Sequence, residues 1–181
     1  MYGGCATKMN ESPSDNPLYF WMPAEPTHGA FSHWHVAETK GDDSNIYPTV
    51  EHYMMYHKAL LFGDQVIAKE VLLLQTPAEV KEAGRRVHGF DRDKWTACRE
   101  QIVFNGNFLK YTQHQELQRL LLETGSRLLV EASPEDRIWG IGYSAADASQ
   151  HRGTWGQNLC GKALDKVRAK LRQQFPTTDA H

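Results

Sequence analysis

The chain has 181 residues and a formal net charge of −2, and 40% of its residues are apolar. This length and apolar content suit one globular domain with a sizeable core. The small charge excludes a protein that grips duplex nucleic acid through a global basic field. The absence of any apolar run of about 18 residues excludes an ordinary transmembrane helix.

The two ends of the chain differ in composition from the middle. Residues 1–16 are rich in Ser, Pro, Asn and Gly and lack the apolar core of a secretory signal, which predicts a flexible arm. Residues 17–175 carry the patterning of a single domain, and residues 176–181 form a tail. Three widely spaced cysteines argue against a disulfide framework. We therefore expect a cytoplasmic protein, or a nuclear one if the source is eukaryotic.

Strand-like patterns occupy the first part of the domain. Apolar residues at 18–21 and 31–36 predict two short strands, and the polar run at 41–45 predicts a turn. Helical patterning follows from residue 50. Thr49 is expected to cap a helix over 50–61, and a second helix is expected over 65–75.

Three capping signals predict where helices begin in the middle of the chain. Thr76, Pro77 and Glu79 form a capping box with proline at the first helical position, which predicts a helix to residue 87. Asp91 is expected to cap a long fourth helix. A second box, over residues 112–115, predicts a new helix that ends near residue 123.

The last third predicts a buried strand over 127–131, a turn over 133–136, a glycine-bearing segment over 139–142 and a helix over 157–173. The whole pattern indicates an α+β protein that is predominantly α-helical. We expect one compact domain with a few short strands.

Two familiar site patterns are weak here. Residues 156–163 resemble a phosphate-binding P-loop, but Ala163 replaces the hydroxyl that binds magnesium and no apolar strand precedes the segment. A weaker reading remains, in which glycines at a helix N-terminus present free N–H groups to an anion. Nine histidines occur without a His-Glu-x-x-His or Cys-x-x-Cys pair, so we expect neither a metal nor a cofactor.

The helix over 50–61 carries the most informative cluster. Glu51 and Lys58 are seven residues apart and therefore share a face, with Met54 and Met55 beside them. An amphipathic helix with a charged rim explains this pattern, and the residues alone favour that interpretation. The alternative is a carboxylate and an amine that flank a pocket. The first-turn position is expected to keep Glu51 ionised.

Two tryptophans form a second cluster. Trp95 and Trp139 are core residues by default, but Asp136 precedes Trp139 by three residues and Gly140 follows it. An aromatic ring beside a carboxylate suits stacking on a nucleobase and contact with a ribose.

Taken together, these segments resemble the NADAR family of YbiA-like N-glycosidases (NAD- and ADP-ribose-associated). The resemblance covers about residues 18–171 in one order and spacing. It rests on Phe31-Ser32-His33-Trp34, Thr49-Val50-Glu51-His52-Tyr53-Met54 with Lys58, Ala83-Gly84-Arg85, Trp95, Glu131-Ala132-Ser133-Pro134-Glu135-Asp136-Arg137-Ile138-Trp139-Gly140 and Gly156-Gln157-Asn158-Leu159-Cys160-Gly161.

The resemblance implies hydrolysis of the N-glycosidic bond between a ribose and a base. It implies catalytic roles for Glu51, Asp136 and Lys58. Substrate-binding positions would be Trp95, Trp139, Phe31, Ser32, His33, Gly84, Arg85, Gly140, Gly156 and Asn158. The family usually has Asn in place of His33, and often an acidic residue in place of Ile141. These departures bear on substrate choice more than on reaction type.

Three functions remain open at this stage. The preferred substrate is ADP-ribosylated guanine in DNA or a nucleotide, because the 181 residues include no riboflavin-synthesis domain and a basic run, Lys81, Arg85, Arg86 and His88, could face phosphates. That run equally well complements a helix dipole. The alternatives are hydrolysis of a ribosylaminopyrimidine phosphate intermediate of riboflavin synthesis, and a non-catalytic ADP-ribose reader. No membrane or obligatory protein partner is expected.

Overall fold

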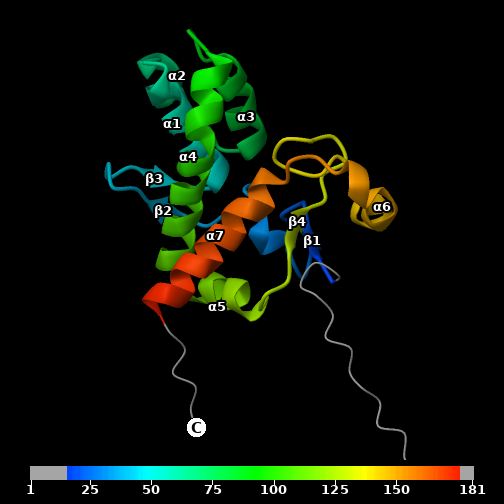
Figure 1. The fold of residues 1–181 in the computed structure, drawn as a ribbon. Coiled ribbons are helices and arrows are strands. Elements are labelled where there is room, and N and C mark those ends of the chain that lie inside the picture. The colour runs from blue at the N-terminus through cyan, green and yellow to red at the C-terminus, as the bar shows by residue number, and fades with distance from the viewer. Residues whose placement is uncertain (1–15, 176–181) are drawn as a thin grey trace, which may run out of the picture.

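Helices dominate the computed structural model, which describes residues 16–175 (Figure 1). The predicted arm and tail lie outside this range, apart from Asn16. In chain order the elements are β1 (Leu18–Phe20), the 3-10 helix η1 (Gly29–Phe31), β2 (Thr39–Lys40), β3 (Ile46–Tyr47), α1 (Val50–Leu61), α2 (Gln65–Val71), α3 (Pro77–Arg85), α4 (Arg92–Gln113), α5 (Gln115–Glu123), β4 (Leu129–Glu131), α6 (Ala145–Ala148), η2 (Ser149–Thr154) and α7 (Leu159–Gln174). The mainly helical α+β class is confirmed.

The strands form two separate pairs. β1 and β4 are parallel, with Leu18 opposite Leu129 and Phe20 opposite Glu131. β2 and β3 form a short antiparallel hairpin. The parallel pair matters for the site because the chain leaves β4 at Glu131 and enters the loop that carries Asp136.

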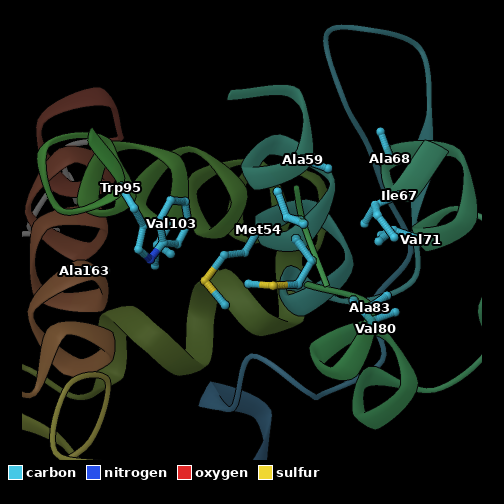
Figure 2. Close-up of a cluster of buried hydrophobic side chains, with 12 residues drawn as sticks. Met54, Ala59, Ile67, Ala68, Val71, Val80, Ala83, Trp95, Val103 and Ala163 are labelled. Atoms are coloured by element: carbon cyan, nitrogen blue, oxygen red, sulfur yellow. The ribbon is translucent and has the colours of Figure 1, made fainter. Parts of the chain in front are cut away.

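The helices pack as two groups joined by α4. α1 contacts α2, α3 and α4, while α4 crosses to α7, which lies against β4 (Figure 1). One apolar core joins α1, α2, α3 and α4, and Figure 2 shows Met54, Trp95 and Val103 within it. A second core lies between the parallel strands, α4, α5 and α7. Among the described helices, none combines the length and apolarity needed to cross a membrane.

Local capping explains why three helices begin where the sequence predicts. Thr49 accepts a hydrogen bond from the backbone N–H of His52, and Asp91 accepts one from that of Lys94. Thr76 and Glu79 form the reciprocal capping box. These bonds satisfy N–H groups that a helix leaves free in its first turn. α2, however, ends at Val71 rather than at residue 75.

Two predictions about local structure are wrong. Residues 31–36 do not form a strand, because their backbone groups bond elsewhere: the His33 carbonyl accepts from the N–H of Glu51, and the Trp34 N–H donates to the Ser32 hydroxyl. Thr112 does not open a new helix. Its hydroxyl donates to the carbonyl of Phe108, so α4 continues to Gln113. The sequence also missed β2, β3, α6 and η2.

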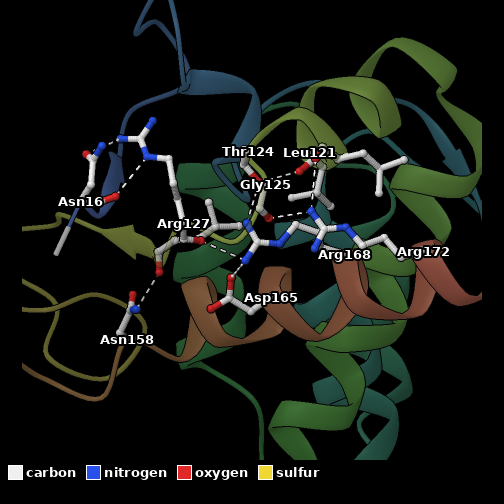
Figure 3. Close-up of polar contacts among 11 residues, drawn as sticks. Asn16, Leu121, Thr124, Gly125, Arg127, Asn158, Asp165, Arg168 and Arg172 are labelled. Carbon is white, nitrogen blue, oxygen red and sulfur yellow. Dashed lines mark hydrogen bonds and ion pairs between the residues drawn. The ribbon is translucent and has the colours of Figure 1, made fainter. Parts of the chain in front are cut away.

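Polar contacts fix α7 against the turn before β4 (Figure 3). The guanidinium of Arg168 donates to the Thr124 hydroxyl at 2.6 Å, to the Arg127 carbonyl at 2.9 Å and to Asp165 at 2.7 Å. Arg127 in turn donates to Asn16. Because Arg168 is buried and fully engaged, these bonds hold the start of β4 at a defined place along α7.

Candidate active site

A cleft of about 870 Å³ opens where α1, α3, the end of β4 and the loop around Asp136 meet. Part of the predicted site lines it: Ser32, His33, Glu51, Lys58, Gly84, Arg85, Asp136 and Trp139. The structure thus brings together residues that lie more than a hundred positions apart in the sequence, including all three predicted catalytic residues.

Glu51 is a buried carboxyl group in the wall of this cleft, with 5% of its surface exposed. Burial raises its pKa to about 7; the positive charge of Lys81 and a hydrogen bond from Trp34 act in the opposite direction. The expectation that the helix N-terminus keeps Glu51 fully ionised is therefore wrong, because desolvation outweighs the helix dipole. A carboxyl group of this kind can exchange a proton near neutral pH.

Lys58 is held in a defined position beside Glu51. Its ammonium donates to the carbonyl of Gly84 at 2.8 Å and lies 4.7 Å from the centre of the Phe90 ring and 5.6 Å from that of Trp95. Burial lowers the pKa of Lys58, while the charge of Glu51 raises it. Trp95 is 8% exposed and lies behind Lys58, within the core (Figure 2), so it does not line the cleft.

Asp136 organises the opposite wall. Its Oδ1 atom accepts hydrogen bonds from the backbone N–H groups of Ile138 and Trp139, both at 2.8 Å. These bonds turn the chain so that Trp139 faces the cleft, where its ring meets that of His33 edge to face at 6.1 Å. A carboxylate and an indole are therefore presented together, as the sequence pattern suggests for ribose and base contacts.

His33 is buried and neutral. Its Nε2 atom accepts from the Asn107 amide at 3.0 Å and lies 3.1 Å from the Cys160 sulfur. Burial, and then the charge of Lys110, lower its pKa to about 3. His33 therefore contributes shape and no positive charge to the cleft, while its backbone carbonyl accepts the N–H of Glu51 in α1.

Four other predicted residues support the cleft from behind. Phe31 packs against Phe20 in the second core. Gly140 and Gly156 allow close backbone approach, since an added Cβ would lie 2.9 Å from the carbonyl oxygen of Glu131 and 2.4 Å from that of Arg137. Asn158 bonds to the backbone of β4. Their predicted contact with substrate stays untested, and none of them lines the cleft.

The N-terminus of α7 is not available to an anion. The N–H groups of Leu159 and Cys160 donate to the carbonyls of Ile138 and Trp139, at 3.1 and 3.0 Å. An added Cβ at Gly161 would lie 2.1 Å from the carbonyl oxygen of Leu129. The weaker anion-binding reading of this glycine segment is therefore wrong, because its glycines and N–H groups hold β4 and the 136–139 loop.

The basic run divides between the cleft and the outer surface. Lys81 and Arg85 line the cleft. Arg86 forms an ion pair with Glu70, and His88 lies 2.8 Å from Asp64. Only two of the four residues of the run therefore line the cleft, and whether they contact phosphates stays a prediction.

Sequence reasoning missed Glu131, which lines the cleft from the end of β4. Burial, followed by the charges of Asp136 and Glu51, raises its pKa to about 8. The available signal was its position, since it is an acidic residue directly after two buried strand residues, Leu129 and Val130. Within the described part of the chain, no group of three or more His, Cys, Asp or Glu residues could hold a metal ion.

Comparison with known proteins gives one consistent result. Residues 19–172 match the family described as NADAR domain. "N-glycosidase R617" of Acanthamoeba polyphaga mimivirus is 42% identical over 79% of this chain and 88% of its own length. The NMR structure of the E. coli protein YbiA covers 97% of this chain and 95% of that one, with 27% identity and a TM-score of 0.74. "Riboflavin biosynthesis protein PYRR, chloroplastic" of Zea mays is 28% identical over 92% of this chain but 27% of its own length.

Proposed function

We propose, since the chain belongs to the NADAR family, that it is an N-glycosidase that hydrolyses the bond between a ribose carbon and a base nitrogen. The observation that carries the proposal is that Glu51, Asp136 and Trp139 line one cleft. A relative that is named as an N-glycosidase supports the same reaction type.

The proposed chemistry follows from the charge that develops on the sugar. Breaking a ribose–nitrogen bond builds positive charge at the anomeric carbon, as in other glycosidases. Glu51 in its ionised form orients the attacking water and stabilises this charge. Asp136 uses one oxygen to fix its loop, and we assign the second oxygen to a ribose hydroxyl. Trp139 stacks on the departing base.

For the substrate, we favour ADP-ribosylated guanine in DNA or a nucleotide. Lys81, Arg85 and Arg137 line the cleft together with Lys58, and they provide positive charge for the two phosphates of an ADP-ribose. Glu51 is buried and Asp136 is half-buried, whereas Lys81, Arg85 and Arg137 are exposed, so we assign the ribose–base bond to the two carboxyl groups. This arrangement separates phosphate binding from bond cleavage within one cleft.

A second candidate is a ribosylaminopyrimidine phosphate, an intermediate of riboflavin synthesis. The maize relative favours it, since that protein is named for riboflavin biosynthesis. The reaction type and the role of Glu51 are the same for both substrates. The single phosphate of this substrate would need fewer of the cleft cations than the two phosphates of an ADP-ribose.

One experiment separates these functions. The protein is incubated with an ADP-ribosylated guanine oligonucleotide and, separately, with a ribosylaminopyrimidine phosphate, and the released sugar is measured. Release of ADP-ribose supports the favoured function, and release from the pyrimidine alone supports the second. Saturable binding of the oligonucleotide without release identifies a reader and contradicts the N-glycosidase proposal.

A further inference from the structure

Four carboxyl groups line the cleft, those of Glu51, Glu131, Glu135 and Asp136, and Glu131 is the one with a buried oxygen atom that no described residue bonds. Its Oε2 atom is buried and has no hydrogen-bond partner among the described residues. A buried polar atom without a partner costs about 1–3 kcal/mol. The same residue lines the cleft, next to the space that a bound molecule would occupy.

The backbone around Glu131 is fixed on three sides, which gives its side chain a defined direction. Its N–H donates to the side-chain oxygen of Asn158 at 2.9 Å, and its carbonyl accepts from the N–H of Ile141 at 3.0 Å. The strand pairing places it opposite Phe20. A backbone anchored in this way fixes the point from which the side chain extends, which suits a task that requires exact placement of one proton.

Charged and titratable groups face Glu131 from every surrounding element. Glu51 comes from α1, Lys81 from α3, Asp136 from the following loop and Cys160 from α7. Burial and the two carboxylates favour the protonated form of Glu131, whereas Lys81 and the Cys160 thiol favour the ionised form. The sum is a raised pKa of about 8, so the neutral acid predominates at pH 7.

We propose that Glu131 is the general acid that protonates the departing base, a role that rests on the proposed N-glycosidase function. The bond between the anomeric carbon and the base nitrogen breaks, and its electron pair goes to the nitrogen, which receives the proton of Glu131. Water adds to the anomeric carbon and gives a proton to Glu51. Transfer of that proton through solvent restores Glu131, so the net reaction consumes one water.

With Glu131 as the acid, Lys58 is not needed to protonate the departing base. Its ammonium already donates to Gly84, and it lies against two aromatic rings. Two carboxyl groups with pKa values near 7 and 8 provide a base and an acid in the same narrow pH range. Glycosidases divide the two tasks between two carboxyl groups in this manner.

The test measures kcat/KM against pH with the ADP-ribosylated guanine oligonucleotide. Wild-type activity should fall above about pH 8. Glu131→Gln should lose at least ~10²-fold at the optimum, the lower range for acid–base roles, and its residual rate should lack the alkaline fall. Glu38→Gln, an exposed carboxyl replaced by the same amide, is the matched control and should keep the wild-type profile.

A second variant keeps the proposal testable if Glu131→Gln does not fold, as judged by circular dichroism. Lys81→Gln changes an exposed residue and removes a charge that lowers the pKa of Glu131, so it should move the alkaline fall to higher pH. An unmoved alkaline limb, or a wild-type rate and profile in Glu131→Gln, overturns the acid role and leaves the N-glycosidase proposal intact. A wild-type protein inactive on this probe and on the ribosylaminopyrimidine phosphate overturns both.

Discussion

Asn158 is joined to Glu131 across the edge of β4: its side-chain Oδ1 accepts the backbone N–H of Glu131 at 2.9 Å, and its Nδ2 donates to the carbonyl of Leu129 at 2.9 Å. Asn158 adopts left-handed backbone angles, with φ of 51° and ψ of 43°. A residue at the start of α7 therefore sets the position of the strand end that carries Glu131 into the cleft.

Replacing this amide should destabilise the fold. Asn158→Ala removes the partners of the Glu131 N–H and the Leu129 carbonyl, and alanine tolerates the left-handed region less well than asparagine, so we expect the free energy of unfolding to fall by roughly 2–4 kcal/mol. Urea unfolding followed by circular dichroism measures it. Asn158→Gly keeps the backbone angles accessible and should lose about 1 kcal/mol less. Equal stability of Asn158→Ala and wild type would contradict the structural role.

Glu51→Gln should reduce activity and increase stability. Loss of the ionisable carboxyl should lower the hydrolysis rate at least ~10²-fold. The folded-state pKa of Glu51, about 7, lies above its ordinary value of 4.5, so the unfolded chain releases this proton first as pH rises. The contribution of Glu51 to the free energy of unfolding therefore falls between pH 4.5 and about 7, and it stays low at higher pH.

The amide carries no such penalty. At pH 8, Glu51→Gln should be more stable than wild type by roughly 2–3 kcal/mol, with the difference shrinking toward pH 4.5. Thermal unfolding at pH 8 and at pH 4.5 checks the stability difference, and the rate assay checks the loss of activity. A variant of normal activity would refute the assigned role, and a pH-independent stability difference would refute the burial argument.

The parts of the fold that were predictable from the sequence depend on neighbours along the chain. Thr49 and Thr76 cap helices through residues three positions away, so the beginnings of α1 and α3 could be predicted. The segment around His33 could not be predicted, because its backbone partner is Glu51 and its side-chain partner is Asn107, seventy-four residues further on. Apolar patterning alone does not reveal such contacts.

The site shows the same limit. Periodicity placed Glu51 and Lys58 on one helix face, and the family resemblance added Asp136, which the structure brings to the same cleft. Burial, however, depends on the completed fold. It raises the pKa of Glu51 to about 7, places Trp95 in the core, and raises the pKa of Glu131 at the end of β4 to about 8.

Lys58 provides a test of whether a covalent intermediate forms. Its pKa is lowered by burial, which increases the neutral amine available to attack the aldehyde of a ring-opened ribose. If a Schiff base forms, borohydride added during turnover should trap a protein–sugar adduct, detected by mass spectrometry, and the adduct should be absent in Lys58→Arg. No adduct in wild type, together with retained turnover in Lys58→Arg, would exclude this role.

His33 should make the protein sensitive to acid. Its folded-state pKa, about 3, lies below the ordinary value of 6.5. Between these pH values the imidazole is protonated in the unfolded chain and neutral in the folded one. The contribution of His33 to stability is complete above pH 6.5 and declines toward pH 3. At pH 4.5 the loss should be roughly 2–3 kcal/mol.

Glu51 and Glu131 act in the opposite direction over part of this range, because their raised pKa values favour the folded state as pH falls. The informative quantity is therefore the difference in unfolding free energy between wild type and His33→Asn, measured at pH 7 and at pH 4.5. Asn has an amide oxygen that can accept from Asn107 but has no proton to gain. From pH 7 to pH 4.5, the unfolding free energy of His33→Asn should rise by roughly 2–3 kcal/mol relative to that of wild type. An unchanged difference would show that the buried imidazole does not control acid stability.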